Sequence, residues 1–262
     1  MSQPVRALAP LPFELVFDDG EPLETNWHAQ QIPLMTHLIR QAMKEQGRAD
    51  FFVSGNNFVY YSVEQAREVA LEEEQGGKKR AFRGPDVYWV GGVDPTRKRE
   101  VWIAWEEDGR LPDFILELLS PKTARNDRTV KKDLYARVFG TSEYFLYDPR
   151  HRKLEGFRLA APGAYRPLAP DIQGRLWSEQ LGVFLGLWHG IWEEREDDWV
   201  RLFRPDGSLV PTRYEAAEQQ AEAERQQAEA ERQQAEAERR RAEQAEAELA
   251  RLRALLGERG AG

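Results

Sequence analysis

The chain has 262 residues, of which 41% are hydrophobic and eight are tryptophan, and its formal net charge is −8. This composition predicts a packed core rather than a disordered chain, and the charge excludes a generally basic coat for nucleic acid. The absence of cysteine excludes disulfides, thiol catalysis, iron–sulfur clusters and cysteine zinc sites. No stretch approaches the ~20 apolar residues of a membrane helix and no signal-peptide pattern is present, so we expect a soluble, cytoplasmic protein.

The first half of the chain alternates between helical and strand patterns. Apolar residues recur every three or four positions over residues 27–46, which predicts an amphipathic helix. Residues 51–62 hold two aromatic and β-branched runs around a Gly-Asn-Asn sequence, a pattern typical of a turn or hairpin. The highly charged segment 63–81 is expected to be an exposed connection. The strongest strand patterns follow at residues 86–93, 101–107 and 113–120.

The second half begins with a helix predicted over residues 123–140, with Val130, Leu134 and Val138 as a modest apolar stripe. A further strand is predicted over residues 143–149. Short segments punctuated by proline and glycine continue to about residue 211, and we expect them to form small antiparallel strands packed at one edge. Three strands, a helix and another strand predict a mixed α/β fold rather than a helical bundle.

The composition changes abruptly after Pro211, where the heptad AEAERQQ and a variant repeat from residue 221. This pattern predicts a charged helix or coiled coil over residues 213–256 and a disordered end over 257–262. Glutamate occupies three successive seam positions, so only the last two heptads can associate firmly. The segment 213–262 holds 9 Arg and 12 Glu, leaving 28 basic and 33 acidic residues elsewhere. Any surface for nucleic acid must therefore be a local basic strip.

Two acids occupy unusual places in the predicted strands. Alternation along strand 113–120 places Glu117 on one face with Ile115 and Leu119. An unpaired acid in so apolar a strand is expensive to bury, and either a salt bridge or a metal ion would explain it. Asp86 supplies a second acid, where an earlier strand enters the sheet. Asp113 shares the face of Glu117 but lies ~13 Å away along the strand, so we expect an orienting or structural role.

A lysine follows on the second predicted helix. Asp127, Lys131 and Tyr135 are spaced at i, i+4 and i+8, which places them on one helical face. An ordinary Asp–Lys surface pair is the common outcome of this spacing, whereas the preceding strand with its buried glutamate favours an active-site lysine. Lys132 is the alternative lysine. Tyr135 and Tyr144 are expected to be core aromatic residues with satisfied hydroxyl groups.

These motifs together resemble a known family. The segments GPDVYWV (84–90) and LPDFILELLSPKTARNDRTVKKDLYARVFGTSEYFLYDP (111–149) are similar to the Uma-two family of restriction endonuclease-like proteins, within the PD-(D/E)XK nuclease superfamily. The family pattern runs from a PD strand and an E-L-L-S-P strand end to D-x-x-x-K-x-x-x-Y, G-x-x-E-Y and D-P, and the likeness spans about residues 13–210. The resemblance implies a restriction-endonuclease-like mixed sheet flanked by helices over residues 1–210.

The resemblance also implies an activity. Family members of this type would hydrolyse DNA phosphodiester bonds as metal-dependent endonucleases. Asp86 and Glu117 would bind Mg²⁺ or Mn²⁺, because these cations take carboxylate ligands. The superfamily lysine would fall at Leu119, so the resemblance implies that Lys131 replaces it. The stretch containing Glu21, Glu24 and His28 corresponds to the region where the superfamily often supplies another acid.

Other functions remain open from the sequence. A catalytically inactive nuclease fold could serve as a scaffold for binding or assembly through its C-terminal helix, and an RNA-directed nuclease would carry the same motifs. Homo-oligomers could form through the nuclease domain or the helix. The basic run Lys78-Lys79-Arg80 either touches phosphates or forms a solvated loop. The tryptophans near residues 188–199 are expected to pack around edge strands rather than stack on bases.

Overall fold

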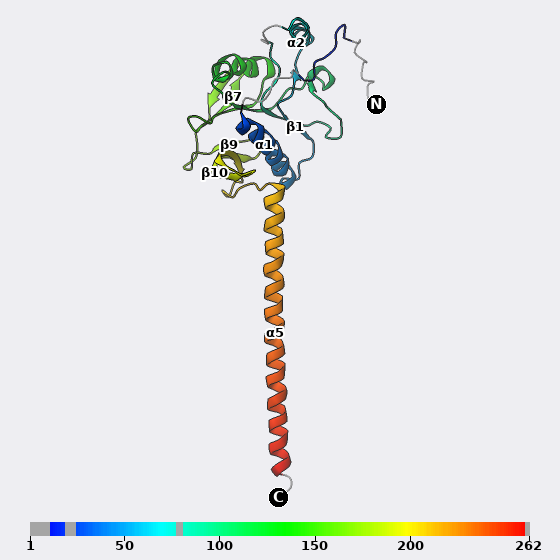
Figure 1. Cartoon of the computed structure of the whole chain (residues 1–262), viewed down its shortest axis with the longest axis vertical. Coiled ribbons are helices and arrows are strands. Elements are labelled where there is room, and N and C mark those ends of the chain that lie inside the picture. The colour runs from blue at the N-terminus through cyan, green and yellow to red at the C-terminus, as the bar shows by residue number, and fades with distance from the viewer. Residues whose placement is uncertain (1–10, 19–24, 77–80, 260–262) are drawn as a thin grey trace. The chain divides into compact units, whose positions relative to one another are not determined.

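The computed structural model describes residues 11–18, 25–76 and 81–259, with side chains as far as residue 250. It forms two units, Met1–Val210 and Pro211–Gly262, and each is described by itself (Figure 1). None of the described helices is both long and apolar enough to cross a membrane.

A six-stranded mixed sheet organises the first unit. Its strands follow the order β1 (Phe51–Gly55), β3 (Val87–Gly91), β5 (Phe114–Leu118), β6 (Glu143–Asp148), β7 (Lys153–Ala161) and β8 (Ala164–Pro167). Strands β5 and β6 pair in parallel and every other neighbouring pair is antiparallel. A parallel pair needs a crossover connection, and the helical segment 124–139 supplies it. The predicted mixed α/β class is confirmed.

Strand β5 divides the core between two faces. Phe114, Leu116 and Leu118 face helix α1 (Asn26–Glu45), while Ile115 and Leu119 belong to the cluster on the opposite face. All five positions of β5 are buried, because helices cover both faces of the sheet. The strand therefore reads as an almost continuous apolar run that a single glutamate interrupts.

A second, antiparallel sheet lies against α1. It is formed by β9 (Leu176–Ser178), β10 (Val183–Trp192) and β11 (Arg195–Phe203). The buried side chain of Gln31 on α1 bonds both backbone groups of Val200, donating to the carbonyl at 3.1 Å and accepting from the N–H at 2.9 Å. Helix α1 thus packs between the two sheets (Figure 1).

The crossover is helical throughout but not uniformly α-helical. It consists of α3 (Ala124–Asn126), the π-helical turn η2 (Asp127–Lys131), α4 (Lys132–Leu134) and the π-helical turn η3 (Tyr135–Phe139), and it ends at the left-handed Gly140 (φ 64°). Tyr135 and Phe139 face the core. The predicted apolar stripe is wrong as a packing face, because Val130 and Val138 are 64% and 53% exposed.

Three local predictions in the first half need correction. The charged segment 63–81 contains helix α2 (Val63–Gln75), which buries Ala66 and Val69. Strand β4 covers only Trp102–Ile103 and is followed by the 3₁₀ turn η1 (Ala104–Glu106). Residues 51–62 form no hairpin, because β1 pairs with β3 while β2 (Val59–Tyr60) pairs in parallel with β4.

The second unit contains one long helix, α5 (Arg213–Arg259), as the composition predicts. A reciprocal cap starts it: the Thr212 N–H donates to Glu215 Oε2 at 2.7 Å, and the Glu215 N–H donates to Thr212 Oγ1 at 3.2 Å. The helix continues beyond residue 256, where we expected it to end. Residues 260–262, the remainder of the segment expected to be disordered, lie outside the described residues.

Candidate active site

Glu117 is the one acid inside strand β5, and it is 1% exposed. Its side chain lies on the same face as the crossover helix. Its Oε1 atom accepts hydrogen bonds from the Lys131 ammonium at 3.0 Å and from the Tyr135 hydroxyl at 2.6 Å. Its Oε2 atom accepts a longer bond from the Asp86 N–H at 3.4 Å. The salt bridge to Lys131 explains part of the burial of this acid. A metal ion remains a second explanation, because Oε2 makes only a long hydrogen bond.

Asp86 reaches the same point from the neighbouring strand. The antiparallel register pairs Val87 with Leu116, which sets Asp86 beside the end of β5. Its Oδ2 atom accepts the Leu118 N–H at 2.6 Å. Each acid thus accepts a backbone N–H from the other acid's strand, and this exchange fixes both carboxylates at one end of the strand pair.

Lys131 lies between two carboxylates. Its ammonium is 3.0 Å from Glu117 Oε1 and 3.1 Å from Asp127 Oδ1, and both acids are 1% exposed. The Asp127–Lys131 pair expected at i, i+4 therefore exists, but it is buried against the sheet rather than solvated. Lys132 points elsewhere, with its ammonium 3.2 Å from the centre of the Phe157 ring. Asp86, Glu117 and Lys131 are brought together, and the alternative lysine is not.

The two π-helical turns explain how the crossover presents this set. Residues four apart in an α-helix are rotated by slightly more than one turn, whereas a wider π turn rotates them by slightly less. Alternating the two geometries keeps Asp127, Lys131 and Tyr135 in line along the sheet. Single π turns occur frequently at functional sites.

Burial dominates the ionisation of the site. It raises the pKa of Asp86 above its ordinary value, although Lys131 and the Leu118 N–H act in the opposite direction. It raises the pKa of Glu117 still more clearly, and the charges of Asp86 and Asp127 add to the rise. The loss of hydration is the larger cause of both shifts, and repulsion between neighbouring carboxylates adds to them.

The lysine responds in the opposite way. Burial alone would lower the pKa of Lys131, but the negative charges of Glu117, Asp127 and Asp86 outweigh it and raise the pKa. Burial likewise raises the pKa of Tyr135 well above its ordinary value. Lys131 is therefore an ammonium and Tyr135 a neutral hydrogen-bond donor at neutral pH.

The donor set fits a hydrated divalent cation. Three carboxylates face one ammonium, so full ionisation leaves an excess of negative charge in a buried place. Lys131 and Tyr135 donate to Glu117 Oε1, whereas Oε2 accepts the longer bond from the Asp86 N–H, and the carboxyl groups of Glu117 and Asp86 are within hydrogen-bond reach of each other. Within the described residues, no three acids or histidines are grouped as a metal cage. A cation here would use Asp86, Glu117 Oε2, the Leu118 carbonyl and water, which suits Mg²⁺.

A histidine fixes that carbonyl. His28 Nε2 lies 3.2 Å from the Leu118 oxygen, and His28 Nδ1 lies 2.8 Å from Thr25 Oγ1. A carbonyl can only accept, so Nε2 carries the hydrogen and, in a neutral ring, the Thr25 hydroxyl donates to Nδ1. Thr25 also accepts the His28 N–H as the cap of α1. The first helix therefore supplies a positioning group to the end of β5.

The remaining candidate residues either make contacts that fit a structural role or lie outside the described residues. Asp113 accepts the Gly91 N–H at 2.9 Å, in keeping with a structural role. Trp199 packs in the core as expected. Arg83, beside the basic run, pairs with Glu72 and Glu73 at 3.3 and 3.2 Å. Glu21, Glu24 and the run Lys78-Lys79-Arg80 lie outside the described residues.

Two contacts in the site were not predicted from the sequence. Tyr135 is a core aromatic residue with a satisfied hydroxyl, as expected, but Glu117 was not predicted as the acceptor of that hydroxyl. The motif spacing did give a signal for this contact, since Tyr135 continues the line of Asp127 and Lys131. His28 was among the candidates at the first helix, but its contact with Leu118 joins positions 90 residues apart, and no local pattern predicts that contact.

Comparison with known proteins gives two findings. Residues 9–192 match the model of the Uma2 family, described as "Putative restriction endonuclease". A crystal structure of "a putative nuclease belonging to DUF820" from Anabaena variabilis is similar over 65% of this chain and 86% of that chain, with 14% identity and a TM-score of 0.42. No curated protein matches the chain.

Proposed function

Because the chain belongs to the Uma2 family, a family of restriction-endonuclease-like nucleases, we propose that it is a Mg²⁺-dependent endonuclease that hydrolyses DNA. The observation that carries the proposal is the meeting of Asp86, Glu117 and Lys131 at the end of β5, with Lys131 in direct contact with Glu117. Two carboxylates with an adjacent ammonium are the groups that phosphodiester hydrolysis needs.

Asp86 and Glu117 would hold the cation, with the Leu118 carbonyl as a further ligand, and Mn²⁺ would substitute for Mg²⁺. When bound, the cation would neutralise phosphate charge and acidify a water molecule. The protonated Lys131 cannot accept a proton from that water. Its ammonium would instead act as a hydrogen-bond donor. In this way it would stabilise the negative charge that develops on the attacking oxygen and the phosphate. Cleavage would leave 5′-phosphate and 3′-hydroxyl ends, as in the nuclease superfamily that the sequence resembles.

Tyr135 and Asp127 act through these groups. The Tyr135 hydroxyl and Lys131 together hold Glu117 Oε1, so that Oε2 stays directed toward Asp86. Asp127 holds Lys131 from the other side and keeps it charged. We class both as positioning residues, since neither needs to touch the substrate.

The test is cleavage of plasmid DNA by the purified protein in Mg²⁺ or Mn²⁺, compared with EDTA. Lys131→Ala should lower the cleavage rate by about 100-fold or more, as losses of single electrostatic groups do. Lys132→Ala is the matched control, because it removes the adjacent lysine, which lies on Phe157, and it should cleave normally. Parallel assays with an RNA of the same sequence determine whether the protein cleaves DNA, RNA or both.

The opposite result favours a different function. If wild-type protein that folds and binds DNA cleaves neither DNA nor RNA under any divalent metal, the fold serves as a scaffold. Equal rates for Lys131→Ala and wild type would remove Lys131 from the chemistry.

A further inference from the structure

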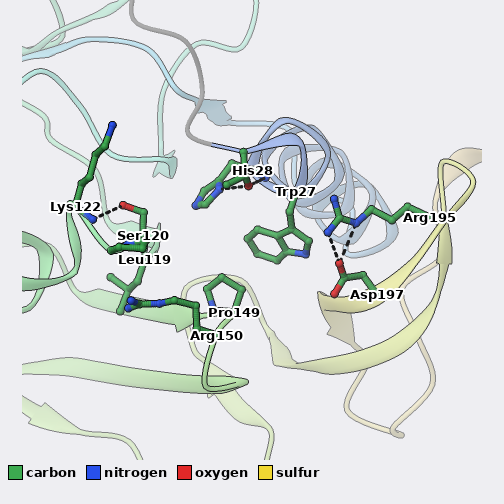
Figure 2. A pocket seen from close by; sticks show the side chains of 11 residues that line it. Trp27, His28, Leu119, Ser120, Lys122, Pro149, Arg150, Arg195 and Asp197 are labelled. Atoms are coloured by element: carbon green, nitrogen blue, oxygen red, sulfur yellow. Dashed lines mark hydrogen bonds and ion pairs between the residues drawn. The ribbon is translucent and has the colours of Figure 1, made fainter.

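A pocket of about 540 Å³ opens beside the loop that follows β5 (Figure 2). Its wall begins at Leu119, two residues after Glu117, and includes His28, which also contacts Leu118. Four segments line it: the start of α1, the loop after β5, the turn after β6 and the beginning of β11. Its volume lies within the ~300–1,000 Å³ of pockets that hold small organic ligands.

One part of the lining is apolar and rigid. It consists of Trp27, Leu119, Pro121 and Pro149. The Trp27 ring stacks on Trp199 with centres 6.0 Å apart and planes 11° apart, and its indole N–H donates to the Asp198 carbonyl at 3.3 Å. This wall is therefore formed before any ligand arrives.

The other part is cationic. Arg195 is held by Asp197 at 2.6 and 2.9 Å, and Arg150 is held by Asp148 at 3.2 and 3.3 Å. Lys122 is exposed and pairs with no acid that the structure describes. Of the three cations that line the pocket, Arg150 and Arg195 are each paired with an acid, so Lys122 leaves the pocket with a local positive charge in a protein whose net charge is −8. The balance favours an anionic ligand, with Lys122 as its first contact.

We propose that this pocket binds one nucleotide of the substrate with its base unpaired. The base lies against the apolar wall, and Lys122 and Arg150 contact its phosphate. The inference rests on the proposed nuclease function and specifies its substrate. In a duplex the flat faces of the bases are stacked on one another, so a protein can contact only the phosphates and the edges of the bases in the grooves. A base outside the stack exposes a flat apolar face that can pack against such a wall.

The proposal implies a preference for single-stranded or locally opened DNA. A base in the pocket places its neighbouring phosphates near the end of β5, because Leu119 and Glu117 are two residues apart. A fully paired duplex would have to release one base to fill the pocket, at a cost in unstacking and unpairing.

The experiment measures metal-free binding to full-length protein in EDTA. Three probes differ by one group each: dTMP, deoxyribose 5-phosphate and inorganic phosphate. The readout is the NMR chemical shift of the Trp27 indole N–H in ¹⁵N-labelled protein. This resonance is assigned by through-bond correlation experiments. We expect dTMP to shift this resonance saturably and to bind at least ~5-fold more tightly than deoxyribose 5-phosphate, because the base adds a stacking contact.

Two lysine variants supply the matched comparison. Lys122→Ala should weaken dTMP binding by about fivefold or more. Lys44→Ala should leave it unchanged, because Lys44 is another exposed lysine, ~24 Å from His28 along α1. Equal affinity for dTMP and deoxyribose 5-phosphate, or a Trp27 resonance that does not move, would overturn the proposal. If the protein cleaves DNA but shows no such binding, only the proposed nucleotide pocket is contradicted. If it binds dTMP in this way but does not cleave, only the proposed nuclease activity is contradicted.

Discussion

Lys131 is the residue whose surroundings most restrict its chemistry. Glu117 and Asp127 contact it, and together with Asp86 they raise its pKa although it is half-buried. A lysine in this state is a donor and a positive charge, not a general base. In the proposed reaction, the proton of the attacking water would therefore leave by another route, and Lys131 would stabilise the charge that remains.

The raised pKa of Glu117 gives a prediction about stability and pH. Its ordinary pKa is 4.5, and burial raises the folded-state value well above that. Its favourable contribution is then complete below pH 4.5 and is lost as the pH rises through the folded-state pKa. Without metal, the free energy of unfolding of wild type should fall relative to Glu117→Gln as the pH rises above 4.5.

Chemical denaturation in EDTA at a series of pH values measures this difference. The comparison with Glu117→Gln cancels the opposing contributions of other carboxylates, such as Asp148, whose pKa is lowered by its partners despite partial burial. A difference that does not change with pH would contradict the raised pKa of Glu117.

His28 gives a second prediction at this scale. His28→Phe keeps an aromatic ring but leaves the buried Leu118 carbonyl without this hydrogen bond. The variant should lose ~1–3 kcal/mol of unfolding free energy. It should also bind Mn²⁺ several-fold more weakly, because the carbonyl is no longer oriented. Denaturation and calorimetric titration measure the two effects, and unchanged Mn²⁺ affinity would rule out a positioning role.

Strand β5 and the crossover helix carry most of the site, and they differ in how far the sequence predicts them. The period of two along β5 correctly separates Glu117 from the α1 face. The spacing of Asp127, Lys131 and Tyr135 places them correctly on one face, but it cannot reveal that this face is buried. The more apolar positions Val130 and Val138 point to solvent instead.

The incorrect predictions for α2 and for the pairing of β2 share one cause, which is that the local sequence pattern is weak or absent. Helix α2 was missed because its buried face consists of small residues such as Ala66 within a run of glutamates, so its periodicity is weak. The β2–β4 pairing joins residues 43 apart in parallel, and no hairpin pattern precedes it. The resemblance to a family supplied what local patterns could not, namely that Asp86, Glu117 and Lys131 belong to one site.

The orientation of the crossover helix can be tested directly. Phe139→Ala should cost ~3–5 kcal/mol of unfolding free energy, because its ring packs on Tyr135 and Phe82. Val138→Ala, one residue away, should change it by less than ~0.5 kcal/mol, because the side chain is 53% exposed. Denaturation curves of the two variants give the comparison. The reverse order of effects would contradict the orientation.

At the scale of the whole molecule, the two units suggest a division of labour. The proposed catalytic groups all lie within residues 1–210, while α5 carries a repeated polar sequence with its own N-terminal cap. Its last two heptads hold the apolar seam Ala242, Ala245, Leu249, Leu252 and Leu256. We propose that this seam mediates partner contact or weak oligomerisation and takes no part in the chemistry.

Removal of residues 213–262 tests that division. The remaining unit should stay folded, and its metal-dependent cleavage per active site should remain within about twofold, while its sedimentation coefficient changes with the loss of self-association. Circular dichroism, cleavage and analytical ultracentrifugation measure the three properties. A truncated protein that is folded but inactive would show that α5 contributes to the active site.

Calorimetric titration with Mn²⁺ tests most directly whether Asp86 and Glu117 jointly hold a divalent metal. Wild type should bind one Mn²⁺ per chain, and Glu117→Gln should weaken that binding by at least ~10-fold, since an anionic ligand is replaced by a neutral amide. Asp113→Asn, on the same face of the same strand region, is the matched control and should bind normally, because an amide oxygen can still accept the Gly91 N–H. Equal Mn²⁺ affinity for wild type and Glu117→Gln, or no binding by folded wild type, would contradict the account.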